Sequence, residues 1–213
     1  MSNFNDSVLF ILQGSTVTIK LFLVVFILSI PLAAILSLVK ICKNKLLKKI
    51  VGIYTWLFRG TPLLLQLFFI YFGLPVLGIK FSRFTAATIA FTLNYAAYLT
   101  EIFRGGLQSV DKGQYEAARA LGMSYSQTMK QIIVPQGMKR VLPSTCNEGI
   151  SLVKDTALVA TIGMEEVLRA SKEILTRDFT IIPFFIAAAI YLCLNSIVVI
   201  CFKMLERRYS YFE

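Results

Sequence analysis

Long runs of apolar residues constrain the fold of this chain more than any other feature of its sequence. The runs cover residues 8–39, 50–77, 84–103, 142–164 and 179–202. A helix of about 20 mostly apolar residues crosses the roughly 30 Å hydrocarbon core of a bilayer. The sequence therefore predicts an all-α integral membrane protein with about five spanning helices. The first run is long enough to hold a short leading segment as well as a span.

The composition indicates that lipid is the solvent for most of the chain. Hydrophobic residues make up 56% of the 213 residues and charged residues 16%, so most of the chain cannot form the half-polar surface of a soluble domain. We expect a single transmembrane domain over residues 1–213, with no second soluble domain. No basic residue precedes the first run and no small-residue cleavage pattern follows it, so a removable signal peptide is not expected.

Basic residues give the chain a formal net charge of +10, and they lie between the apolar runs. One cluster follows the first run and another follows the last: Lys40, Lys43, Lys45, Lys48 and Lys49, then Lys203, Arg207 and Arg208. Loops rich in Lys and Arg stay on the cytoplasmic side, so both clusters predict an outside N-terminus and a cytoplasmic C-terminus. Nucleic acid is not an expected partner, because it would require this charge on a folded soluble face.

Several classes of site are excluded by residue type. The chain has no histidine, and its four cysteines include no CxxC pair. Histidine-based triads and haem ligation are therefore excluded, and neither a disulfide framework nor a metal site is predicted. A membrane enzyme would need a nucleophile–base pair or clustered metal ligands, and an ion channel would need a filter-like loop between two spans. The loop at residues 78–83 is too short for such a filter.

Residues 104–140, between the third and fourth runs, form a polar stretch that suits an inner-face loop with short amphipathic helices. The stretch contains a pattern of small residues: Glu116-Ala117-Ala118, Gly122, Ile132 and Val134-Pro135. Consecutive alanines followed by a glycine favour a helix-turn-helix that another protein surface can approach closely. Alternatively, the loop is an ordinary one in which Glu116 meets the dipole at a helix N-terminus.

The spacing of these residues resembles the EAA loop of permease subunits in bacterial binding-protein-dependent ATP-binding-cassette (ABC) importers, although Val134 stands where that family prefers leucine. Two more stretches resemble the polar amino acid branch of the family: Phe58-Arg-Gly-Thr-Pro-Leu-Leu-Leu-Gln66 and Lys154-Asp-Thr-Ala-Leu158. The resemblance covers nearly the whole chain. It implies the type I ABC importer permease fold and a transport subunit, not an enzyme, in the bacterial cytoplasmic membrane.

The resemblance also implies partners. They are a separate ATPase subunit, a second permease copy or a sibling, an extracytoplasmic substrate-binding protein and membrane lipid. In the family the loop docks in a groove of the ATPase, and this contact falls on Glu116, Ala117, Ala118, Gly122 and Pro135. The chain lacks the phosphate-binding pattern GxxxxGK(S/T). We therefore expect no cofactor in this chain, with ATP and Mg²⁺ bound by the partner ATPase.

Two acidic residues in the fourth run are candidates for substrate binding, because an ionisable residue inside a span costs about 2.5–3.5 kcal/mol on insertion scales and marks a pathway. Glu148 and Asp155 are seven positions apart, which places them on one helix face with about 10.5 Å of rise between them. That separation is comparable to the length of an extended lysine or arginine. We expect one carboxylate to bind the α-amino group and the other to bind a cationic side chain.

The second run offers a further set of polar residues, with Arg59 and Gln66 seven positions apart and Thr61 and Pro62 between them. We expect Arg59 and Gln66 to face one way, with a break in the helix at Thr61 and Pro62 between them. Proline removes a backbone donor and clashes with the carbonyl four residues earlier, which frees backbone polar groups toward a cavity. We expect Arg59 to hold a substrate carboxylate through a bidentate contact, with Thr61 and Gln66 beside it.

Other interpretations of these charged residues stay open. Arg59, Glu148 and Asp155 could instead pair with one another or with Lys154 and fix the packing of the helices. The substrate is expected to be a cationic amino acid such as arginine, lysine or histidine, with glutamine or cystine as the alternative.

The third run contains polar and aromatic residues whose expected role is mainly structural. For Asn94, Tyr95 and Tyr98, interhelical hydrogen bonding is favoured over lining of a pore. Glu101 and Arg104 are three positions apart near the inner end of the run, and we expect a surface ion pair between them.

Overall fold

The computed structural model describes residues 4–209, and within that part of the chain no β-strand occurs. The helices are α1 (Phe4–Ile41), α2 (Lys45–Gly60), α3 (Leu63–Phe68), α4 (Arg83–Gln108), α5 (Lys112–Ala120), α6 (Tyr125–Thr128), α7 (Val134–Asp155), α8 (Val167–Asp178) and α9 (Ile182–Tyr209). Shorter 3-10 and π-helical turns cover Phe69–Gly73, Leu74–Leu77, Met129–Ile133 and Thr156–Ile162. The predicted all-α class is confirmed.

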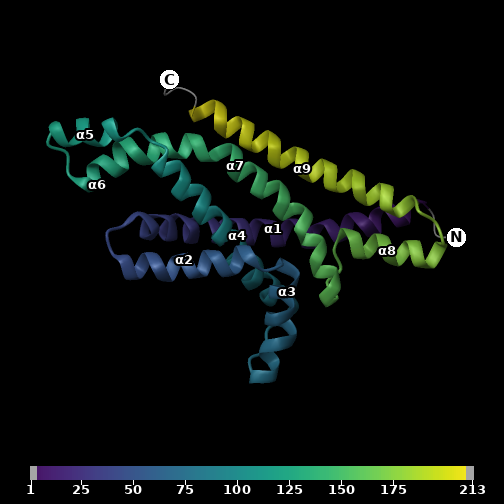
Figure 1. Ribbon diagram of the computed structural model, residues 1–213. Helices are drawn as coiled ribbons and strands as arrows, with labels where there is room; N and C mark the ends of the chain where they lie inside the picture. The colour runs from purple at the N-terminus through teal and green to yellow at the C-terminus, as the bar shows by residue number, and fades with distance from the viewer. Residues whose placement is uncertain (1–3, 210–213) are drawn as a thin grey trace.

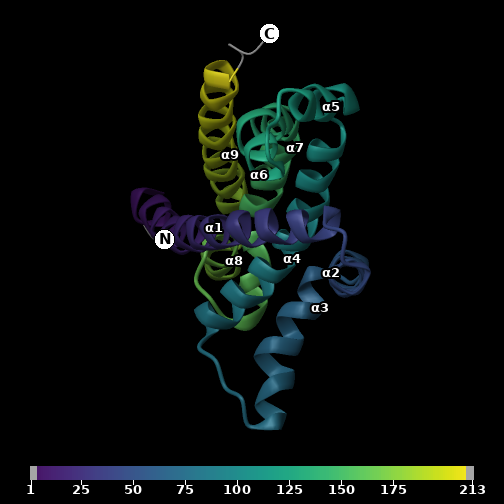
Figure 2. The ribbon, with the colours of Figure 1, turned by 90° about the vertical axis from the view of Figure 1, so that its left-hand side faces the viewer.

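The long helices pack side by side, α1 against α4, α4 against α7, and α7 against α9 (Figure 1). The short helices α5 and α6 lie at one end of this bundle, and α8 lies at the other end beside α1 and α9. Turning the molecule shows that α3 and the turns after it extend away from α5 and from the end of α9 (Figure 2).

Helix α1 is one unbroken helix of 38 residues, not a short leading segment followed by a span. It continues through Gly14 and Pro31, and much of its buried face consists of small side chains: Ser7, Gly14, Thr18, Ser29, Ala33 and Ser37. Small residues let neighbouring helices approach closely, which explains how α4 packs along so much of its length.

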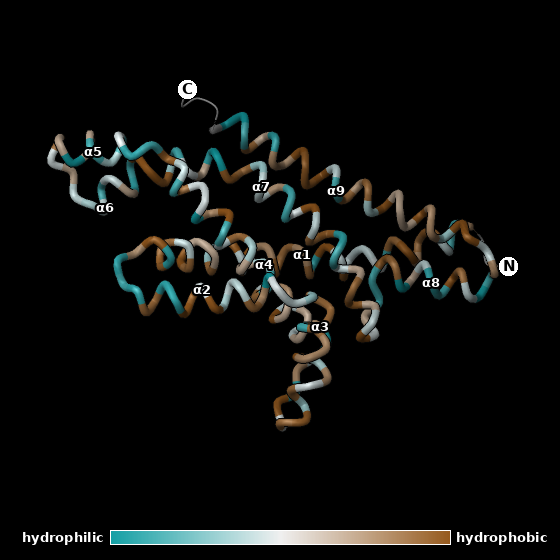
Figure 3. Tube along the Cα trace, in the orientation of Figure 1, coloured by the Kyte–Doolittle hydropathy of each residue, from teal (hydrophilic) through white to brown (hydrophobic). Residues whose placement is uncertain are grey.

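Two helices among the described residues, α1 and α9, are long and apolar enough by length and composition to cross a membrane. The second apolar run is split into α2 and the segment Leu63–Leu77, which meet at 103° and count as a third span if taken together. Hydrophobic residues lie along α1 and α9, and hydrophilic residues gather at α5, α6 and the turn between α1 and α2 (Figure 3). About five spans, and the sides on which the termini lie, remain predictions.

Helix α4 lies at the centre of the largest buried cluster. Phe91 and Tyr95 of α4 pack with Leu21 and Val25 of α1 and with Leu152 of α7. Phe91, Leu21, Val25 and Leu152 are fully buried. This core fixes α4 between α1 and α7 and sets the position of the polar residues that α4 presents to the α2–α3 break.

Candidate functional site

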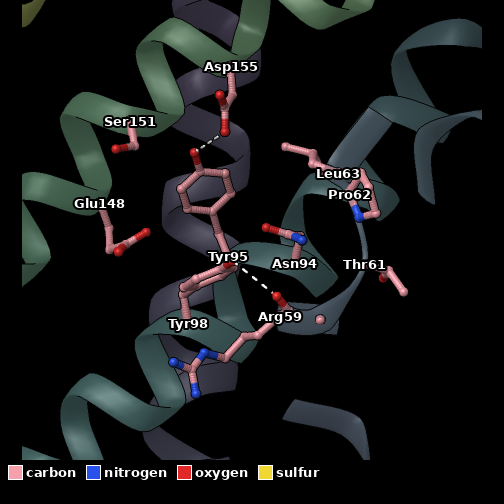
Figure 4. Close-up of a pocket in the computed structure, with 11 residues that line it drawn as sticks. Arg59, Thr61, Pro62, Leu63, Asn94, Tyr95, Tyr98, Glu148, Ser151 and Asp155 are labelled. Atoms are coloured by element: carbon pink, nitrogen blue, oxygen red, sulfur yellow. Dashed lines mark hydrogen bonds between the residues drawn. The ribbon is translucent and has the colours of Figure 1, made fainter. Parts of the chain in front are cut away.

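A cavity of about 520 Å³ lies where the α2–α3 break faces α4 and α7. It is lined by Arg59, Gly60, Thr61, Pro62, Leu63, Asn94, Tyr95, Tyr98, Glu148, Ser151 and Asp155. The acidic residues of α7 lie on one side, the residues of the break on the other, and the α4 side chains between them (Figure 4). The cavity thus brings together four residues predicted as substrate contacts, namely Arg59, Thr61, Glu148 and Asp155.

The two carboxylates lie on the same face of α7, as their spacing predicted. Asp155 accepts a hydrogen bond of 2.6 Å from the Tyr95 hydroxyl. Glu148 makes no hydrogen bond or ion pair with any residue from 4 to 209. Ser151, one helical turn from each acid, also lines the cavity. Sequence analysis missed Ser151, although its position three residues after Glu148 and four before Asp155 could have identified it.

Arg59 contributes the positive charge of the cavity lining. Its guanidinium carbon lies 5.3 Å from the centre of the Tyr98 ring, within the range of a cation–π contact. The Tyr98 hydroxyl donates to the Arg59 backbone carbonyl over 3.3 Å. Tyr98 therefore holds both the backbone and the side chain of Arg59 against α4.

The proposed pairing of the cavity charges with one another is not observed within residues 4–209. Neither Glu148 nor Asp155 forms a salt bridge there with Arg59 or Lys154. Both carboxylates line the open cavity. The three charged groups therefore share one cavity without an ion pair among the described residues.

Asn94, Tyr95 and Tyr98 of α4 line the cavity and also make interhelical hydrogen bonds. The prediction favoured interhelical hydrogen bonding over lining of a pore, but these side chains do both. Sequence spacing could not separate the two roles, because a residue at the edge of a cavity can serve both.

Gln66 is not among the residues that line the cavity. The helix ends at Gly60 and restarts at Leu63, so the predicted break at Thr61 and Pro62 is present, but Gln66 does not face the cavity with Arg59. Gln66 is only 9% exposed, and its side-chain nitrogen donates to the Phe58 carbonyl over 2.9 Å. Its other hydrogen bonds are with the Thr61 carbonyl and hydroxyl and with the Asn94 amide.

The predicted helix-turn-helix in the polar loop is present. Helix α5 carries Glu116, Ala117 and Ala118, and Gly122 follows it with φ of 76°, a left-handed conformation that glycine adopts without strain. Pro135 lies at the first turn of α7. Beside the motif, the apolar side chain of Leu121 is 81% exposed.

Glu101 is part of a polar cluster between three helices and is not a simple surface ion pair. It accepts hydrogen bonds from Arg104 of its own helix (2.8 Å), from Thr55 of α2 (3.1 Å) and from Lys40 of α1. Lys40 also donates to the Thr55 hydroxyl over 2.8 Å. The predicted Glu101–Arg104 pair is confirmed, but Lys40 and Thr55 come from other runs and carried no local signal in the sequence.

Comparison with known proteins gives consistent matches over almost the whole chain. Residues 29–211 match the family described as binding-protein-dependent transport system inner membrane component. An arginine transport system permease protein of Bacillus subtilis is 42% identical over 201 residues, which are 93% of this chain and 92% of that protein. A Rickettsia felis protein named for glutamine transport is 39% identical over 207 residues, 96% of this chain and 95% of that protein.

A solved structure has the same fold. The crystal structure of an amino acid ABC transporter with histidines contains a chain that superposes with a TM-score of 0.88 and 34% sequence identity. The match covers 98% of this chain and 99% of that one. The match therefore extends over nearly the whole of the bundle in Figure 1.

Proposed function

We propose that the cavity binds a cationic amino acid. This chain belongs to the family of binding-protein-dependent transport inner membrane components and is the permease subunit of an amino acid ABC importer. As a transport subunit of the inner membrane it is not an enzyme, and ATP is hydrolysed by separate ATPase subunits. A partner permease completes the assembly. The relatives differ in the amino acid for which they are named.

One observation carries the choice of a cation: two carboxylates and one guanidinium line the same cavity without pairing among the described residues. Their formal charges sum to −2 + 1 = −1. Arginine or lysine carries two positive groups and one carboxylate, so each charge would find an opposite partner. Glutamine has only one positive group, and one of the two acids would stay unpaired in a low-dielectric site, which is costly.

The dimensions fit the same ligand. Arg59 would hold the substrate carboxylate through a bidentate contact. Glu148 and Asp155 are separated by about 10.5 Å of helical rise, so one would hold the α-amino group and the other the side-chain cation, directly or through water. Thr61 lies at the same wall as Arg59, and its hydroxyl donates to the Leu57 carbonyl and accepts from Gln66 Nε2. Glutamine or cystine is the alternative substrate.

The remaining partners follow from the family. An extracytoplasmic substrate-binding protein would deliver the amino acid, and ATP with Mg²⁺ would be bound by the ATPase. Helix α5 and the turn after it would dock on that ATPase through Glu116, Ala117, Ala118 and Gly122, with Pro135 starting the helix that leads back to the cavity. The exposed positions of Glu116 and Ala117 support this contact.

The experiment is ATP-dependent uptake of labelled arginine, lysine, glutamine and cystine into liposomes that contain the permease, its ATPase and its binding protein. Glu148→Gln keeps the size of the side chain and removes its charge. Loss of one charge-assisted hydrogen bond should reduce arginine and lysine uptake by at least about tenfold.

Glu165→Gln is the matched control, because Glu165 is exposed and lies outside the cavity, and we expect it to leave uptake unchanged. If wild type and Glu148→Gln take up each of the four amino acids at the same rate, Glu148 is structural. Transport of glutamine without arginine by the wild type would favour the alternative substrate.

A further inference from the structure

The break between α2 and α3 exposes one backbone carbonyl in particular. In a continuous helix the Phe58 carbonyl would accept a hydrogen bond from the backbone N–H of residue 62, but Pro62 has no N–H. Thr61 and Pro62 are extended, with ψ of 145° and 135°. An unpaired carbonyl is costly where lipid replaces water, so this group requires another donor.

Two side-chain amides supply it. Gln66 Nε2 and Asn94 Nδ2 each donate to the Phe58 carbonyl over 2.9 Å. Asn94 Nδ2 also donates to Gln66 Oε1 over 3.1 Å, which joins the two amides. Gln66 Nε2 lies 3.1 Å from the Thr61 carbonyl and 2.8 Å from the Thr61 hydroxyl. Gln66 and Asn94, the amide clasp, therefore hold both sides of the break.

The backbone held by the amide clasp is also a wall of the cavity. The clasped carbonyls belong to Phe58 and Thr61. Arg59 lies between these two residues in the sequence and Pro62 follows them. Arg59, Thr61 and Pro62 all line the cavity. Gln66 does not line it. Asn94 does, with its oxygen on the side of Tyr95 and its nitrogen on the side of Pro62 (Figure 4).

We propose that the amide clasp is a positioning device for ligand binding: it fixes the extended Thr61–Pro62 backbone and thereby sets where Arg59 meets the ligand. Gln66 acts on the ligand through the backbone of the break, not through contact. The inference rests on the proposed function in one respect, namely that the cavity binds an amino acid.

The test measures the Kd of labelled amino acids for the purified permease–ATPase complex without binding protein. Wild type is first tested with arginine, lysine, glutamine and cystine, and the variants are tested with whichever it binds. Gln66→Met and Asn94→Leu remove the donors at similar size. Asn195→Leu is the matched control, because Asn195 is an amide on α9 that does not line the cavity and whose oxygen has no partner among the described residues.

Each clasp variant should weaken binding by about tenfold, the effect of one buried hydrogen bond of about 1.4 kcal/mol. The double variant should weaken it by more than the product of the two, because either amide alone still pairs the Phe58 carbonyl and only the double variant leaves it unpaired. The Kd and the basal ATP hydrolysis of Asn195→Leu should not change.

The outcomes separate the two proposals. If the wild type binds an amino acid and the clasp variants bind it equally well, with only a lower yield or melting temperature, the amide clasp is purely structural. Failure of both variants to assemble would overturn the positioning role in the same way. If the wild type binds only glutamine or cystine, the cationic substrate is wrong while the clasp test proceeds with that ligand. Binding of none of the four would end both proposals.

Discussion

Glu166 is a fully buried carboxylate outside the predicted spans, at the N-terminus of α8. Its oxygens accept hydrogen bonds of 2.7 Å from the backbone N–H groups of Leu168 and Arg169 and from the Tyr191 hydroxyl of α9. On α1, a Cβ at Gly14 would lie 2.9 Å from the Glu166 carbonyl carbon. The residue thus caps α8 and joins it to α9, and the close approach at Gly14 brings α1 against it.

Glu166 predicts a pH dependence of stability. Burial raises its pKa above the ordinary 4.5, although the three hydrogen bonds oppose the shift. Because the folded state binds this proton more tightly than the unfolded state, its contribution to stability is complete below pH 4.5 and declines as the pH rises through the folded pKa. The difference in melting temperature, wild type minus Glu166→Gln, should therefore decrease as the pH rises from 4 to 8 (about four pH units).

Glu165→Gln, the neighbouring exposed acid, should show a difference from wild type that does not change with pH. A constant difference between wild type and Glu166→Gln over the same range would contradict the assignment to Glu166.

At the scale of elements, the crossing of α4 and α7 depends on two glycines. A Cβ at Gly106 would overlap the Val141 side chain and lie 3.0 Å from the Gly137 carbonyl. A Cβ at Gly137 would lie 3.3 Å from the Gly106 carbonyl. Small residues at such a crossing let two backbones approach each other. This crossing sets the distance between the α4 tyrosines and the α7 carboxylates.

Gly106→Ala should destabilise the protein by about 1–3 kcal/mol, the usual cost of overpacking a close contact. Gly105→Ala on the same helix is the matched control, because nothing lies within 4 Å of a Cβ there, and its better helix propensity should leave stability unchanged or higher. Thermal unfolding of the detergent-solubilised protein measures both. Equal melting temperatures for the two variants would contradict the close crossing.

The sequence pattern predicted which residues share one face of a continuous helix. It did not predict which residues of different helices meet. Glu148 and Asp155 share a face because α7 is continuous, so their spacing was sufficient. For Arg59 and Gln66 the break at Pro62 was predictable, but the side that Gln66 faces after it was not, because Gln66 meets Asn94 of another helix. Lys40 and Thr55 meet Glu101 through packing of three runs, which no local pattern encodes.

At the scale of the whole molecule, α7 connects the loop that carries the proposed ATPase contact with the acid pair of the cavity. Helix α7 begins at Val134, within the last residues of the coupling motif, and ends at Asp155. A movement of α5 imposed by an ATPase would therefore reach the cavity through α7. It would also reach the cavity through α4, which packs against α7 along the bundle. The motifs and the helical class were predictable from sequence, whereas this connection required the fold.

The most direct test of the account is a structure of the assembled permease–ATPase complex with arginine bound. We expect arginine in the cavity, with its carboxylate on Arg59 and its two positive groups on Glu148 and Asp155. Arginine bound elsewhere, or bound in the cavity without contact to either acid, would contradict the assignment of a cationic substrate to this site.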